Sequence, residues 1–235
     1  MRKAMMAICI ALGLVLAVSI LTRTRTESEQ EVNLGAFTTE VMIIKIDGDQ
    51  TQLAMWFPFE FFVEADLQDR KSNRASAESD LAFLKPYITI IVQCSTDKPD
   101  GTSIYANEKA VAARAVLQAS DGTTLEPLKT VPPMLSVAVS AMKQMMAAEG
   151  DAGGENMHIL VFPNKTKDGK ALIDANRKGS LKLVLKASGN FKDSTFVWKT
   201  PFDAMKSVPP CPKCNEQVSA KWTFCPWCGA RLPQN

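Results

Sequence analysis

Residues 180–187 read Ser180-Leu-Lys-Leu-Val-Leu-Lys-Ala187, and this alternation decides the fold class. The leucines occupy every second position, whereas the lysines fall on the other side of an extended backbone. A period of two residues is typical of a β-strand that buries one face and exposes the other. The stretch therefore predicts a strand of an antiparallel sheet rather than a helix.

The same alternation recurs between residues 40 and 205. It covers Met42–Ile46, Tyr87–Ser95 and Phe196–Trp198, whereas Met157–Phe162 is apolar on both faces and predicts a central strand. About eight strands at this spacing predict a mainly β body. We expect an antiparallel β-sandwich, for which an Ig-like topology is a hypothesis.

Asp-Gly dipeptides separate the predicted strands. They occur at Asp47-Gly48, Asp121-Gly122 and Asp168-Gly169, and both residues of such a pair tolerate the positive φ of a hairpin turn. The strongest hairpin predictions are Gln118–Thr123 and Thr166–Ala171. All these aspartates are interpreted as turn residues.

One or two helices are predicted within the body. Ser76–Leu84 is a short one, and Met134–Glu149 is a longer one that begins after two prolines. Asn107–Leu117 predicts a short helix that runs into a strand. The longer helix has one apolar stripe at helical spacing, which is formed by Leu135, Val139, Met142 and Met146.

Residues 1–22 predict an N-terminal hydrophobic helix that targets or anchors the chain. Ala4–Leu21 contains no charged residue and follows two basic ones. The run is close to the length of a membrane-spanning helix, but it is also compatible with an export signal cleaved after Ser19. Both alternatives place the protein in the cell envelope, either anchored by one span with the body outside the cytoplasm or exported. Residues 23–39 are polar and predict a linker.

The tail, residues 206–235, carries two Cys-x-x-Cys pairs: Cys211 with Cys214, and Cys225 with Cys228. Two such turns brought together by a short hairpin supply four sulfurs in a tetrahedron, which is the geometry of a closed structural zinc site. Two disulfides are an alternative that an oxidising compartment would favour. A redox dithiol is a further alternative, but the βαβ context of that motif is missing.

The sequence around these cysteines resembles a zinc ribbon with knuckles of the Cys-Pro-x-Cys-Gly kind, over about residues 208–232. Gly229 ends the second knuckle, and Asn215 takes the equivalent place in the first, where a positive φ is expected. The expected hairpin has strands at Gln217-Val218 and Lys221–Phe224. The resemblance implies Zn²⁺ as a structural ion but assigns no activity, since ribbons serve as docking pieces, nucleic-acid contacts and plain staples.

Charge argues against non-specific nucleic-acid binding. The chain has 27 Lys and Arg against 25 Asp and Glu, and without Arg2 and Lys3 of the first 22 residues the balance is 25 to 25. Proteins that bind nucleic acid through phosphates carry an excess of basic residues. The tail has four basic residues and one acidic residue, Glu216, and four thiolates around one zinc ion add a charge of about −2. The tail is therefore nearly neutral as well.

Few other residues suggest chemistry. His158 is the single histidine and lies in an apolar strand, and Cys94 lies on the inward face of another, so both are interpreted as packed core residues. The aromatic run Trp56–Phe62 is also interpreted as core. No Gly-x-Ser-x-Gly motif is present, so whether the protein is an enzyme stays open, with the sequence leaning against it.

These observations favour a non-catalytic, exported or membrane-tethered interaction or scaffold protein with a structural zinc ribbon. A protein partner is expected, together with membrane contact through residues 4–21 if they are retained. One alternative is a zinc- or thiol-dependent metal-handling or redox protein that uses the Cys-x-x-Cys pairs. The other is a cytoplasm-facing ribbon that binds a protein or nucleic acid.

Overall fold

The computed structural model describes residue 32 and residues 34–70, 73–148, 152–166, 168–205, 210–216, 218 and 222–233. The elements in chain order are α2 (Leu34–Val41), β1 (Met42–Asp47), β2 (Gln50–Phe57), α3 (Phe59–Arg70), α4 (Arg74–Asp80), the 3-10 turn η1 (Ala82–Leu84), β3 (Tyr87–Asp97), β4 (Ser103–Tyr105), α5 (Glu108–Arg114), β5 (Ala115–Ala119), β6 (Thr124–Leu125), α6 (Pro133–Ala148), α7 (Ala152–Glu155), β7 (His158–Pro163), β8 (Gly179–Leu185), β9 (Ser194–Thr200) and η2 (Asp203–Met205).

The strands form two antiparallel sheets. Sheet A has the order β1-β2-β3-β4, with β7 also paired to β3, and sheet B has the order β6-β5-β8-β9. The mainly β, antiparallel character expected from the sequence is therefore confirmed. The first three strands all lie in sheet A, whereas an Ig domain moves its third strand to the opposite sheet.

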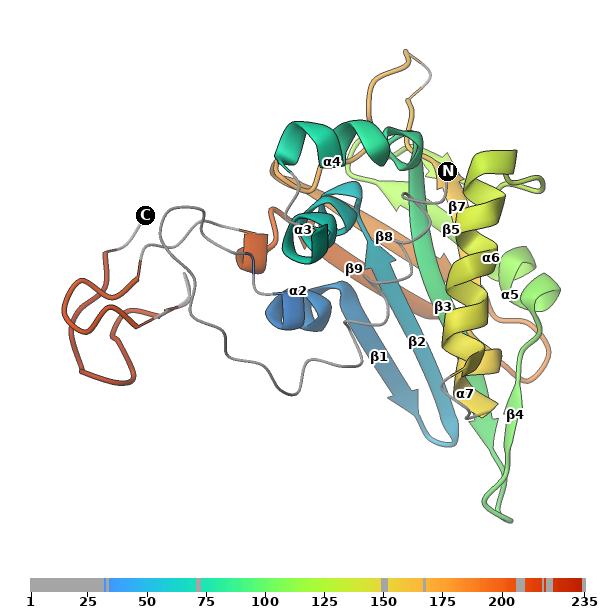
Figure 1. Cartoon of the computed structure of the whole chain (residues 1–235). Helices are drawn as coiled ribbons and strands as arrows, with labels where there is room; N and C mark the ends of the chain where they lie inside the picture. The colour runs from blue at the N-terminus through green and yellow to red at the C-terminus, as the bar shows by residue number, and fades with distance from the viewer. Residues whose placement is uncertain are drawn as a thin grey trace.

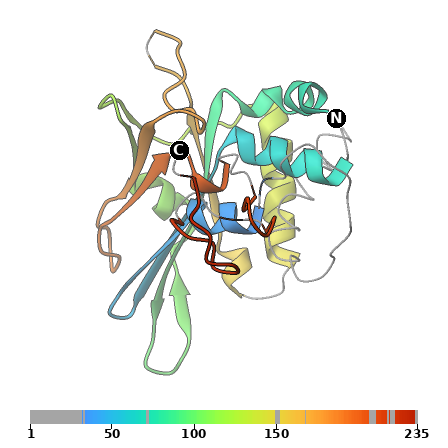
Figure 2. The same cartoon turned by 90° about the vertical axis from the view of Figure 1, so that its left-hand side faces the viewer.

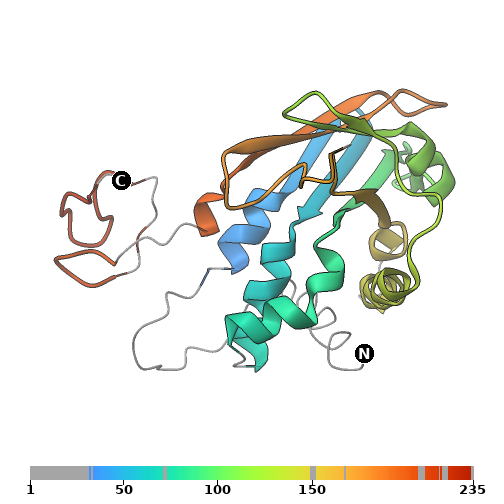
Figure 3. The same cartoon turned by 90° about the horizontal axis from the view of Figure 1, so that it is seen from above.

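Sheet A is covered on both faces. Sheet B lies over one face, and the helices α2, α3 and α6 lie over the other (Figures 1 and 3). Residues of β2 alternate accordingly: Phe57 contacts Phe61 and Phe62 of α3, with ring centroids 4.9 and 6.2 Å away, whereas Trp56 contacts Trp198 of β9 at 6.1 Å. One continuous hydrophobic core therefore includes residues of both sheets and of the helices.

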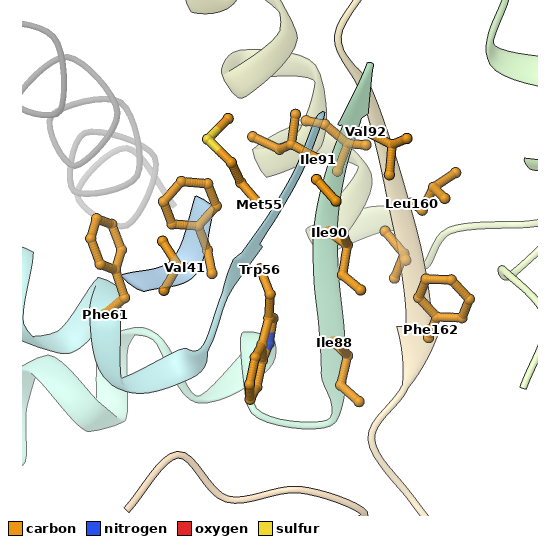
Figure 4. Close-up of a cluster of buried hydrophobic side chains, with 14 of the residues drawn as sticks. Val41, Met55, Trp56, Phe61, Ile88, Ile90, Ile91, Val92, Leu160 and Phe162 are labelled. Carbon is orange, nitrogen blue, oxygen red and sulfur yellow. The ribbon is translucent and has the colours of Figure 1, made fainter. Parts of the chain in front are cut away.

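The core centres on Trp56 and β3. Ile88 and Ile90 of β3 lie on the same side as Trp56, while Ile91 points to the helical side (Figure 4). Trp198, 2% exposed, donates its indole N–H to the backbone oxygen of Val41 at 2.7 Å, which ties sheet B to the end of α2. The turn ends of the hairpins β1–β2 and β3–β4 extend beyond the rest of the body (Figure 2).

Most of the predicted elements are present, with some corrections. α5 runs directly into β5, as expected for residues 107–117, and α6 buries its predicted stripe. β7 was expected to be central, but among the described strands it pairs only with β3. Both its faces are nevertheless buried, and its other edge accepts a backbone hydrogen bond from Leu128 to Val161 at 2.7 Å.

Two further differences lie near the start of the body and after β7. The first described helix begins at Leu34, inside the segment expected to be a linker, and its Phe37 is fully buried. Near residues 166–171, Gly169 donates its backbone N–H to the oxygen of Thr166 in a tight turn, but no strand described by the structure flanks this turn as a hairpin. Residues 1–22 lie outside the described residues. Within the described part of the chain, no helix combines the length and the apolar character needed to cross a membrane.

Candidate metal centre

The tail contains two knuckles with the same local geometry. In the first, Asn215 donates its backbone N–H to the oxygen of Cys211 at 2.8 Å, and Cys211 donates to Glu216 at 2.9 Å. In the second, Gly229 donates to Cys225 at 2.9 Å, and Cys225 donates to Ala230 at 2.8 Å. Each is a tight turn that places both cysteine side chains on its inner side.

Both knuckles close through a residue with positive φ. Asn215 has φ of 59° and Gly229 has φ of 70°, which confirms the conformation expected at these two positions. Glycine adopts it freely, and asparagine is among the residues that tolerate it best. The departure of Asn215 from the usual glycine therefore leaves the knuckle intact.

The two knuckles bring the four cysteines together. The sulfur of Cys211 lies 3.6 Å from that of Cys228, the sulfur of Cys214 lies 3.6 Å from that of Cys225, and all four lie within 4.8 Å of one another. A disulfide needs a sulfur–sulfur distance of about 2.05 Å, so the cysteines here are separate thiols. Four sulfurs at these distances could hold one metal ion between them.

Burial is uneven around the four sulfurs. Cys211 and Cys225, the first cysteine of each knuckle, are 1% and 2% exposed and pack with Leu232 in a small hydrophobic cluster. Cys214 and Cys228 are half-buried. None of the described residues of the body belongs to this cluster, and the tail lies beside the body in Figures 1 and 3.

The environment splits the pKa values of the thiols. Backbone N–H groups of Cys214 and Lys213 donate to the sulfur of Cys211 and lower its pKa to about 6. For Cys214, a backbone hydrogen bond at Glu216 lowers the pKa, but burial and the three neighbouring sulfurs outweigh it and raise the pKa to about 12. Thiols this close oppose each other's ionisation, and a bound cation would remove that opposition because thiolates are the binding form.

The hairpin expected between the knuckles is described only in part, because residues 217 and 219–221 lie outside the described ranges. The residues expected to form its second strand pair instead with residues that follow the second knuckle. Phe224 forms a bridge with Arg231, and Leu232 donates its backbone N–H to the oxygen of Thr223 at 2.9 Å. The ring of Trp222 lies 5.5 Å from that of Trp227. These aromatic side chains were not singled out as functional from the sequence.

The other candidate residues are part of the body core. His158 is 8% exposed, and its Nε2 lies 2.7 Å from the backbone oxygen of Ala106. Cys94 is fully buried, and its sulfur lies 3.7 Å from Oε1 of Gln52. Burial raises the pKa of Cys94, although Arg114 beside it acts in the opposite direction. The thiol is therefore neutral at pH 7 and lacks the depressed pKa of a reactive cysteine.

The body also has a cleft of about 220 Å³ near the start of α3. Its charged lining includes Glu60, Glu78, Lys85 and Asp174. Burial raises the pKa of Glu60, and repulsion from Asp174 and Glu78 adds to this effect against the attraction of Lys85. Nothing in the spacing of the sequence marks these residues, since they come together from a helix start, a short helix and two loops.

No family model matches the chain, and no curated protein matches it. Among solved structures, it is similar to a DUF4426 family protein from Pseudomonas aeruginosa PAO1, with 12% sequence identity and a TM-score of 0.30. The similarity covers 68% of this chain and 93% of that one.

Proposed function

We propose that the chain is a non-catalytic, exported or membrane-tethered interaction protein whose tail is a structural zinc ribbon. The observation that carries this proposal is the cluster of four sulfurs within 4.8 Å. The remaining parts of the proposal, a β-sandwich body and an N-terminal anchor or export signal, are taken over from the expectations based on the sequence.

Zinc is the ion that the donor set favours. Two of the sulfur pairs are 3.6 Å apart, close to the edge of about 3.8 Å that a tetrahedron has when its Zn–thiolate bonds are about 2.3 Å long, and the other pairs lie within 4.8 Å. A site with four thiolates offers no open position for water or substrate, which is typical of structural rather than catalytic zinc. Soft thiolates also select zinc over magnesium or calcium.

The body supports a scaffold role. Its two antiparallel sheets share one core, and we propose that they form a β-sandwich. Residues 1–22 are proposed to hold this body at the outer side of a membrane or to direct its export, because Ala4–Leu21 carries no charge.

The test is zinc content and thiol reactivity of the full chain. We expect one zinc per chain and four tail thiols that react only after denaturation or chelation. Cys214→Ser should lose the metal, whereas Cys94→Ser, a change at a buried cysteine outside the cluster, should keep it. A metal-free protein with two disulfides in the tail would overturn the proposal.

A metal-handling role is a second candidate, and it is favoured by the half-buried position of Cys214 and Cys228. A site that passes its ion to another protein needs sulfurs that an incoming ligand can reach. Exchange of bound zinc for cadmium within seconds would support this candidate, whereas exchange over many hours would support the structural role. A reporter fused to the C-terminus would also separate the outside location from a cytoplasm-facing ribbon.

A further inference from the structure

The tail has three aromatic side chains, and all three are exposed. Trp222, Phe224 and Trp227 are 39%, 58% and 58% exposed, whereas the buried members of the tail core are two cysteines and one leucine. The two tryptophan rings touch at 5.5 Å in an edge-to-face arrangement. Phe224 lies two residues after Trp222 in the chain. We call these three exposed side chains, which come from the second knuckle and the segment just before it, the aromatic face.

A basic residue adjoins this face. Phe224 and Arg231 are paired in an antiparallel bridge, and side chains directly opposite each other in such a pair lie on the same face with Cβ atoms about 5 Å apart. Arg231 is exposed. The aromatic face thus has a guanidinium beside Phe224, one of its two most exposed rings.

This combination matches the chemistry of a phospholipid headgroup region. Tryptophan is enriched at membrane interfaces because its ring is apolar while its N–H needs a polar partner, and arginine binds lipid phosphate. Single-stranded nucleic acid would also stack on aromatic rings, but it needs a positively charged groove. The tail offers little net charge, since four thiolates around zinc offset most of its lysines and arginines.

We propose that the aromatic face docks on the phospholipid bilayer, with Trp222, Phe224 and Trp227 in the headgroup region and Arg231 on a lipid phosphate. This inference rests on the proposed membrane tether, which would keep the tail near the bilayer surface. Docking would make the chain touch the membrane at two places, the N-terminal segment and the tail.

The distribution of tryptophan makes a direct test possible. The chain has four tryptophans, and none lies in residues 4–21, so the anchor contributes no signal. Trp56 and Trp198 are each 2% exposed in the body core. Lipids brominated near the headgroup end of their acyl chains quench tryptophan only at close range. In nanodiscs of phosphatidylcholine and phosphatidylglycerol, quenching of the full chain therefore reports on Trp222 and Trp227.

We expect brominated nanodiscs to quench the wild-type emission, and Trp222→Phe combined with Trp227→Phe to remove the quenched component. Phe224→Ala keeps both reporters and should reduce quenching. Arg231→Gln should reduce it when phosphatidylglycerol is present and have a smaller effect in phosphatidylcholine alone. Zinc content is measured on every sample, because a variant whose tail has unfolded loses the metal. If Phe224→Ala loses zinc, Arg231→Gln is used in its place to test the aromatic face.

Equal emission in brominated and ordinary nanodiscs, from protein that stays in the disc and holds zinc, would overturn the docking inference while the tether stands. Protein that alkaline carbonate removes from the disc would instead contradict the tether. Quenching that persists after Trp222 and Trp227 are both replaced by phenylalanine would show that the aromatic face is not the contact and would also overturn the inference.

Discussion

Leu232→Ala should weaken the zinc binding that we propose for the tail, although Leu232 is not one of the four cysteines. Its side chain is 4% exposed and packs with Cys211 and Cys225 in the small core of the tail. Truncating a buried leucine to alanine costs about 2–5 kcal/mol. The lower end applies here, because the neighbouring Cys214, Val218 and Cys228 are only partly buried and the site can collapse around the missing atoms.

This cost should appear in the apparent affinity for the metal. A short metal-stabilised segment folds and binds in one coupled step, so a loss of folding free energy is a loss of binding free energy. About 2 kcal/mol corresponds to an apparent zinc affinity that is lower by about 30-fold. Competition between the full chain and a chelator of known affinity measures this change.

The matched control makes the same substitution in the other core. Leu185→Ala removes a fully buried leucine of β8, so it should lower the melting temperature of the body and leave zinc affinity unchanged. The reasoning is refuted if Leu232→Ala binds zinc as tightly as the wild type. It is also refuted if Leu185→Ala weakens zinc binding as much, since the two cores would then be energetically coupled.

Three further changes test the local arguments. Trp198→Phe leaves the buried carbonyl of Val41 without its 2.7 Å donor and should lower the free energy of unfolding by about 2 kcal/mol in urea titrations, and an unchanged midpoint would contradict that bond. The raised pKa of Glu60 means that ionisation of its carboxyl disfavours the fold, so the contribution of Glu60 to wild-type stability falls as pH rises above 4.5. Glu60→Gln should therefore raise the melting temperature at pH 7 and not below pH 4, and an equal effect at both pH values would speak against it. Asn215→Ala leaves a side chain without a polar group at a backbone φ of 59°, which alanine tolerates less well than asparagine. The strain of about 1 kcal/mol should lower the apparent zinc affinity about fivefold in the same chelator competition, whereas Asn215→Gly should keep the wild-type affinity.

Strands with one buried face were predictable from the sequence. The alternation at residues 180–187 matches β8, where Leu181, Leu183 and Leu185 are fully buried and the intervening side chains are half-buried. Here the period of two survives because one face of sheet B is solvated.

The stretch from β2 into α3 was not predictable in the same way. Trp56, Phe57, Phe61 and Phe62 are all buried, some against sheet B and some against the helices, so no period appears in the sequence. A continuous apolar run is compatible with a strand or a helix. In the structure, Pro58 lies at the junction where the strand ends and the helix begins.

In the tail, the cysteine spacing predicted the convergence of the four sulfurs because each Cys-x-x-Cys turn fixes its own geometry. The exposure of Phe224 and Trp227 could not be predicted. It depends on the direction in which each side chain points from the folded knuckle, and the spacing of the cysteines does not determine that direction. The charged cleft around Glu60 was also out of reach, because segments distant in the sequence form it.

The separation of the two hydrophobic clusters has an evolutionary consequence. Among the residues that the structure describes, no side chain belongs to both, so a substitution that repacks one of these clusters does not directly alter the packing of the other. The body can therefore accumulate changes at its core while the tail retains little more than its cysteines, Leu232 and the two turn residues. Among descendants of a common ancestor, the tail would stay recognisable after the body had drifted beyond detection, and it could be transferred to an unrelated protein as a portable unit.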